Sequence, residues 1–112
     1  MTEELKYSIE VETVEMLRSV FDPEIPVNVY ELGLIYKIDV REDAHDDSKA
    51  EIVIDMTLTA PNCPAADFIM MDIQEKLESI KNVSKVTVNL VFEPEWTKDM
   101  MSEEARLDLG LM

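Results

Sequence analysis

Residues 51–92 read EIVIDMTLTAPNCPAADFIMMDIQEKLESIKNVSKVTVNLVF, and this stretch decides the fold. In residues 52–58 apolar side chains alternate with polar ones, which predicts a half-buried strand. After a turn at residues 60–62, apolar side chains recur at helical spacing through residues 66–80, and strict alternation returns in residues 86–92. The stretch therefore predicts strand, helix and strand, joined by a right-handed crossover that makes the two strands parallel.

The preceding residues add a strand and a helix to this unit. Residues 34–41 alternate like residues 51–58, and the charged connection at residues 42–49 lets the two strands pair as an antiparallel hairpin. Further upstream, Val11, Val14, Leu17 and Phe21 recur at helical spacing, which predicts a helix that ends at Asp22-Pro23 because the residue before a proline disfavours helix.

The two faces of the three predicted strands differ, and this difference sets the architecture. One face is apolar and the other is largely charged or hydroxylated, so only one face needs to be covered. Near the C-terminus, Ser102 is a suitable N-cap for a short helix and Gly110 a suitable stop. We therefore predict a single domain over residues 1–112. Its class is α+β, a two-layer sandwich with a three-stranded mixed sheet, helices on one face, and the order α-β-β-α-β-α.

The charge balance excludes several classes of partner. The 112 residues include 25 acids and 10 lysines and arginines, for a net charge of -15. Nucleic acids and anionic lipid surfaces both require a basic patch, so we expect neither as a partner. No apolar run approaches the roughly 18 residues of a membrane span, and no basic leader precedes an apolar segment. These features predict a cytoplasmic protein.

Cys63 is the single cysteine of the chain, so an internal disulfide or a site built from several cysteines of one chain is excluded. Pro64 suits the first position of the following helix, which places Cys63 at or beside the N-cap. Backbone donors and the helix dipole there favour the thiolate, the form that attacks electrophiles and binds soft metals. The alternative is a small buried side chain without reactivity.

Other polar residues have a functional and a structural interpretation. Asp22 and Glu24 flank Pro23 and present two carboxylates to a ligand, or Asp22 caps a turn and Glu24 faces solvent. Thr59 follows the strand parity opposite the core, so its hydroxyl is expected at the sheet edge near Cys63. His45 lies among acids in the hairpin connection, and we expect it in a solvated loop rather than beside the cysteine.

The C-terminal segment also leaves two alternatives. Met100 and Met101, near Trp96, form either a soft contact surface for another protein or a tail that covers the protein's own core. Arg106 pairs either with an acid of this chain or with a carboxylate of a partner. The sequence does not distinguish these options.

Three blocks of sequence together resemble a known family. They are DPEIPVNVYELGLIY at residues 22–36, TLTAPNCP at 57–64, and EPEWTKDMMSEEARLDLG at 93–110. The blocks are similar to those of the small iron-sulfur assembly accessory proteins, which include the SufT type, the phenylacetate-pathway PaaD type and a subunit of the eukaryotic cytosolic iron-sulfur targeting complex. The chain differs in carrying Asn62 where the family often has glycine, and in lacking the cysteine-bearing tail of the PaaD type.

The resemblance implies a compact α+β domain that helps to mature iron-sulfur proteins. It implies that Cys63 is the functional thiol, and the supporting positions that match the family are Asp22, Glu24, Thr59, Trp96, Ser102 and Arg106.

We therefore expect a maturation factor rather than an enzyme. In this hypothesis Cys63 contacts iron, an iron-sulfur cluster or a client transiently, and no cofactor is stably bound. One thiol cannot enclose a cluster, so a stable site would require a homodimer or external ligands. The expected partners are iron-sulfur assembly or carrier proteins and apo-client proteins. The alternatives are a cysteine-dependent thiol or sulfur transferase, and a structural interaction domain with a buried cysteine.

Overall fold

The computed structural model describes residues 1–23, 25–60 and 64–110. The chain forms its elements in the predicted order, and a short 3-10 turn, η1, precedes the last helix. The elements are α1 (Glu3–Leu17), β1 (Ile35–Glu42), β2 (Ala50–Met56), α2 (Ala66–Glu78), β3 (Val83–Leu90), η1 (Lys98–Met100) and α3 (Glu103–Asp108). Within these described residues, no helix is long and apolar enough to cross a membrane.

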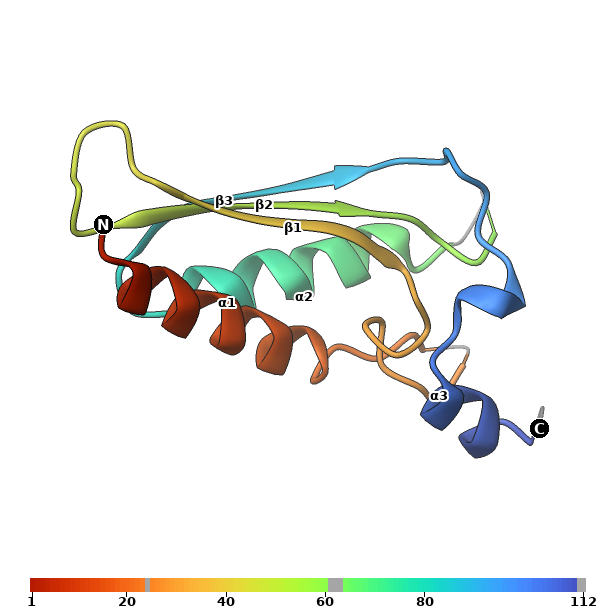
Figure 1. The fold of residues 1–112 in the computed structure, drawn as a ribbon. Coiled ribbons are helices and arrows are strands. Elements are labelled where there is room, and N and C mark those ends of the chain that lie inside the picture. Colours follow the sequence, from red (N-terminus) through yellow and green to blue (C-terminus); the bar gives the residue numbers. More distant parts are fainter. Residues whose placement is uncertain (24, 61–63, 111–112) are drawn as a thin grey trace.

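The sheet has β2 at its centre and is mixed, as predicted. β1 runs antiparallel to β2, and β3 runs parallel to it. In this register Ile54 of β2 lies opposite Ile38 on one side and Val88 on the other. Both long helices lie on the same side of the sheet, while α3 lies at the end of the molecule near the C-terminus (Figure 1). The predicted two-layer α+β sandwich is confirmed.

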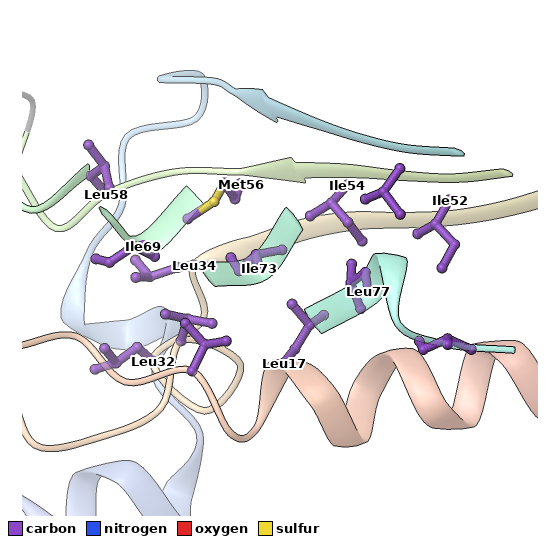
Figure 2. Packing of buried hydrophobic residues seen from close by; sticks show 14 of the residues in the cluster. Leu17, Leu32, Leu34, Ile52, Ile54, Met56, Leu58, Ile69, Ile73 and Leu77 are labelled. Carbon is purple, nitrogen blue, oxygen red and sulfur yellow. The ribbon is translucent and has the colours of Figure 1, made fainter. Parts of the chain in front are cut away.

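The core lies between the sheet and the two long helices. Figure 2 shows Ile52 and Ile54 pointing from the sheet toward the layer that holds Ile73 and Leu77, while Leu17 reaches up from α1. All five side chains are fully buried. Complete burial of a side chain of this size stabilises a fold by about 1.5–3 kcal/mol relative to exposure. This apolar layer therefore fixes the sheet and both helices relative to one another.

The structure corrects the buried face of α1. In the predicted stripe Leu17 is buried as expected, but Val11 is 38% exposed. Phe21 is 53% exposed and lies beyond the helix, which ends at Leu17 rather than at Asp22. The buried face runs from Leu17 back through Thr13 and Ile9, which are spaced four residues apart. The hydroxyl of Thr13 donates a hydrogen bond to the carbonyl oxygen of Ile9 at 2.7 Å, so it is satisfied without water. Local pairing of this kind makes a polar residue acceptable at a core position.

Ile9 and Val11, on the buried and the exposed side of α1, should contribute differently to stability. We expect Ile9→Val to lower the free energy of unfolding by about 0.5–1.5 kcal/mol, because it removes one buried methylene. Val11→Thr, on the exposed side of the same helix, should change it by less than about 0.5 kcal/mol. Urea denaturation followed by circular dichroism measures both values. A larger loss for Val11→Thr than for Ile9→Val would restore the stripe expected from the sequence.

Candidate functional site

The candidate site begins where the chain leaves β2. The backbone N-H of Thr57 donates to the carbonyl of Leu34 at 2.8 Å, and that of Val91 donates to the carbonyl of Met56 at 2.8 Å. These bonds hold the end of β2 between the residue that precedes β1 and the residue that follows β3. The side chain of Thr57 is buried, while Thr59, two residues further on, is half-buried. Thr59 therefore reaches the sheet edge, as its strand parity predicts.

A hollow of about 280 Å³ lies at this edge. It is formed by the end of β2 and by the segment that follows β3, so it brings together residues from two distant parts of the sequence. Thr59 and Trp96, both expected at the site from the sequence, share its wall. The residues that line it are Thr57, Leu58, Thr59, Phe92, Glu93, Glu95 and Trp96.

Trp96 is held in the wall of the hollow by a long-range hydrogen bond. Its indole Nε1-H donates to the carbonyl of Leu32 at 2.8 Å. Ser102 attaches the same C-terminal segment a second time, because its backbone N-H donates to the carbonyl of Glu31 at 2.8 Å. Its hydroxyl also accepts from the N-H of Ala105 at 3.1 Å, which confirms Ser102 as the N-cap of α3.

Tyr36 holds the segment that contributes Glu93 and Glu95 to the hollow. Its hydroxyl donates to the carbonyl of Pro94 at 2.8 Å, and so ties β1 to the segment between Glu93 and Glu95. Burial raises the pKa of Tyr36 above its ordinary value, and a hydrogen bond with Thr57 acts in the opposite direction. The phenol therefore remains protonated at neutral pH and keeps its role as a donor.

The C-terminal tail covers the protein's own core. Met101 and Ala105 are buried, which favours this alternative over a free methionine surface. Arg106 contacts an acid of its own chain, because its Nη2 lies 3.3 Å from Asp99 Oδ1. The same nitrogen lies 3.4 Å from the carbonyl of Lys98. In this structure Ser102 and Arg106 position the tail and do not line the hollow.

The acidic pair predicted at the site is described only in part. Asp22 is buried at 4% exposure, and its backbone N-H donates to the carbonyl of Val27 at 3.4 Å. It takes part in the turn after α1 and is not among the residues that line the hollow. Glu24 lies outside the described residues. A ligand-binding role of this pair stays a prediction.

Cys63 also lies outside the described residues, but the start of the following helix is described. α2 begins at Ala66 with Ala65 as its N-cap, so the placement of Pro64 at the first helical position is wrong. Ala65 has φ -93° and ψ 4°, and Pro64 and Ala65 both lie in a turn before the helix. Pro64 thus lies in a turn, two residues before the first residue of α2.

His45 lies in an exposed loop, as predicted. It is in the connection between β1 and β2, and its backbone N-H donates to Asp43 Oδ1 at 2.7 Å. Figure 1 shows this loop at the end of the sheet opposite to the end where β2 leads into α2. Within the described residues, no group of three or more histidine, cysteine or acidic side chains is arranged to hold a metal ion.

The segment after β3 contributes three residues to the hollow that were not expected at the site. Phe92, Glu93 and Glu95 line it, although only Trp96 of this segment was expected at the site. The sequence could have indicated Glu93 and Glu95, because both lie close to Trp96 in the block at residues 93–110 that resembles the family. Which of its side chains face the hollow depends on how the segment after β3 packs beside the end of β2. The two segments are far apart in the sequence, so a local pattern does not predict this contact.

Comparison with known proteins agrees with this description. Residues 10–90 match a family model described as "Iron-sulfur cluster assembly protein". A protein of Porphyromonas gingivalis, named an Fe-S protein maturation auxiliary factor, is 59% identical over 103 residues, which is 92% of each chain. The Fe-S protein maturation auxiliary factor SufT of Staphylococcus aureus is 38% identical over 82% of this chain and 98% of its own length.

A solved structure shares the fold over the whole length. The crystal structure of a domain of unknown function from Bacillus anthracis superposes with a TM-score of 0.80 and 34% sequence identity. The similarity covers 99% of this chain and 100% of the other. The segment leading to Cys63 falls within the family match at residues 10–90. The later segment, which lines the hollow and attaches the tail, is covered by the similarity to the Bacillus anthracis structure.

Proposed function

The chain belongs to the iron-sulfur cluster assembly protein family, and from this premise we propose that it is an accessory factor that acts in iron-sulfur protein maturation through Cys63 and through docking of partner proteins. The observation that carries the proposal is the similarity to named maturation auxiliary factors over most of the chain. The proposed place of action is the cytoplasm.

The proposed role of Cys63 rests on its type and its position. Cysteine thiolates are the usual ligands of iron-sulfur clusters. Cys63 is the single cysteine of the chain, and it follows Thr59 by four residues in the segment that connects β2 to α2. A single thiol suits brief contact with iron, a cluster or a client protein during transfer. The iron or cluster is cargo in this scheme, and a homodimer that shares it through two Cys63 thiolates stays a prediction.

The net charge of the chain indicates which kind of protein surface it binds. The net charge of -15 repels other acidic surfaces and favours the basic surface regions of proteins. We propose that carrier proteins and apo-client proteins present such regions.

A cysteine-dependent transferase is less well supported by the geometry. Such chemistry needs a base near the thiol. The single histidine of the chain is His45, and the loop between β1 and β2 that carries it lies at the end of the sheet opposite to the end where β2 leads toward α2 (Figure 1). We therefore favour the maturation factor over the enzyme.

The proposed function is tested in cells that lack this protein. We expect the activity of aconitase, a labile iron-sulfur enzyme, to fall while its protein level is unchanged, because the apo-enzyme accumulates. Expression of the native chain should restore the activity, and chemical reconstitution of the extract with iron and sulfide should restore it as well. Malate dehydrogenase, which has no cluster, serves as the control. Unchanged aconitase activity under both iron-replete and iron-poor growth would contradict the proposal.

A further inference from the structure

The hollow beside β2 has a lining that points to a specific kind of ligand. It combines two carboxylates from Glu93 and Glu95 with the aromatic rings of Phe92 and Trp96. None of the described residues that line it is a lysine or an arginine, so no cation of its own wall balances these carboxylates. We propose that the hollow binds an arginine side chain of a partner protein.

The carboxylates supply the charge that this ligand needs. Glu93 and Glu95 are exposed, and they flank Pro94, whose carbonyl accepts the hydrogen bond from Tyr36. This bond ties the short segment to β1 and keeps both glutamates at the rim. A guanidinium group offers five donors in a planar fork, and carboxylates accept these donors in pairs.

The aromatic rings supply a surface for the planar part of the ligand. Trp96 is fixed by its hydrogen bond to the carbonyl of Leu32, so its ring is preorganised. Phe92 is 48% exposed, which leaves its ring accessible from solvent. Arginine stacks on aromatic faces and attracts them through its charge, and its guanidinium is more weakly hydrated than the ammonium of lysine. These properties favour arginine over lysine as the occupant.

The arginine must come from another protein. The chain has three arginines, and each already pairs with an acid of its own. Arg18 lies 3.0 Å from Glu31, Arg41 lies 2.6 Å from Asp39, and Arg106 lies 3.3 Å from Asp99. A second copy of this chain would also bring a charge of -15 to the contact. A basic partner protein is therefore the occupant that fits the charges.

This inference deepens the proposed function, and it rests on that function only in identifying the basic protein as a partner in maturation. Thr59 lines the hollow and precedes Cys63 by four residues, so a partner held by its arginine would be bound next to the segment that carries the thiol. Binding itself is decided by the chemistry of the hollow and can be measured without any maturation assay.

The test uses the full chain, labelled with nitrogen-15, and acetyl-arginine methylamide as the probe. The chain has one tryptophan, so its indole N-H gives one unambiguous signal in the hollow. We expect millimolar probe to shift this signal in a saturable way. Acetyl-citrulline methylamide has nearly the same shape without the charge, and it should cause no saturable shift. We expect Glu93→Gln/Glu95→Gln to weaken binding by about three- to tenfold, as for two exposed ion pairs.

Two further variants distinguish the hollow from general attraction to an acidic protein. Glu3→Gln/Glu4→Gln removes the same charge from α1 at the opposite end of the molecule (Figure 1) and should leave the affinity unchanged. Phe92→Leu keeps an apolar wall but removes a ring, and should weaken binding about two- to fivefold. The inference is overturned if arginine and citrulline bind equally, if no probe shifts the signal, or if both glutamate pairs matter equally. A failed aconitase assay with intact arginine binding would overturn the proposed function instead.

Discussion

Gly33→Ala is expected to lower the free energy of unfolding by roughly 2–4 kcal/mol, counting both backbone strain and a steric clash. Gly33 has φ 78°, a left-handed conformation that costs a residue with a Cβ about 1–2 kcal/mol. A Cβ at this position would also overlap the carbonyl oxygen of Met100 and lie 2.8 Å from its carbonyl carbon. Backbone atoms cannot rotate out of the way as a flexible side chain does, so the C-terminal segment itself must move.

The clash should have a local signature at the hollow. The segment that carries Met100 also carries Trp96, whose indole donates to the carbonyl of Leu32, next to Gly33. Displacing this segment exposes the indole to water, so we expect Trp96 fluorescence to shift to longer wavelength in the folded variant. Urea denaturation followed by circular dichroism gives the global stability, and the emission spectrum without urea gives the local effect.

Gly110→Ala is a matched control for the steric part of this prediction. Gly110 also has a left-handed backbone, with φ 71°, but a Cβ there would meet no atom of the described residues within 4 Å. This variant should lose only the conformational contribution of about 1–2 kcal/mol. Equal losses of stability for the two alanine variants would show that the contact between Gly33 and Met100 is not tight.

Cys63→Ser is expected to abolish function without unfolding the protein. In cells lacking the native chain, we expect the serine variant to leave aconitase activity at the level of the deletion strain. A serine hydroxyl stays protonated at neutral pH, whereas a thiolate is the form that binds iron and attacks electrophiles. Aconitase activity is measured at matched abundance of the native and variant proteins, and the free energy of unfolding is measured on the purified proteins.

Asn62→Gly provides the control from the same connection. It keeps the thiol and introduces the residue that the family often has there, so it should rescue as well as the native chain. Equal rescue by Cys63→Ser and the native chain would move the mechanism from the thiol to the docking surfaces. Loss of stability in Cys63→Ser, together with native Cys63 that resists alkylation, would instead support the alternative of a buried structural cysteine.

Most of the fold could be predicted from the sequence because its signals are local. The alternation through Ile52, Ile54 and Met56 and the helical spacing through Ile69, Ile73 and Leu77 each depend on neighbours within one element. These repeating patterns predict the order of the elements. The polar outer face of the strands predicts that both long helices lie on the same side of the sheet. Part of the site was also predictable, since Thr59 and Trp96 do meet at the hollow.

Two predictions were wrong, the buried face of α1 and the start of α2, and in both segments two local conformations fit the sequence equally well. On α1, stripes through Val11 and through Ile9 both have helical spacing, and the choice depended on Thr13, whose hydroxyl is satisfied inside the helix. Before α2, Pro64 fits both the first position of a helix and the second position of a turn. Packing against the rest of the protein selects between such solutions, and a local pattern does not contain that information.

The sequence by itself determined the order of the elements, the acidic character and the single thiol, because composition and periodicity are properties of the chain alone. Only the tertiary structure decided that the tail covers the core, that Gly33 meets Met100, and that Glu93 and Glu95 join Thr59 around one hollow. These contacts join segments far apart in the chain. They form because the C-terminal segment returns to the loop before β1 and is held there by hydrogen bonds from Trp96 and Ser102.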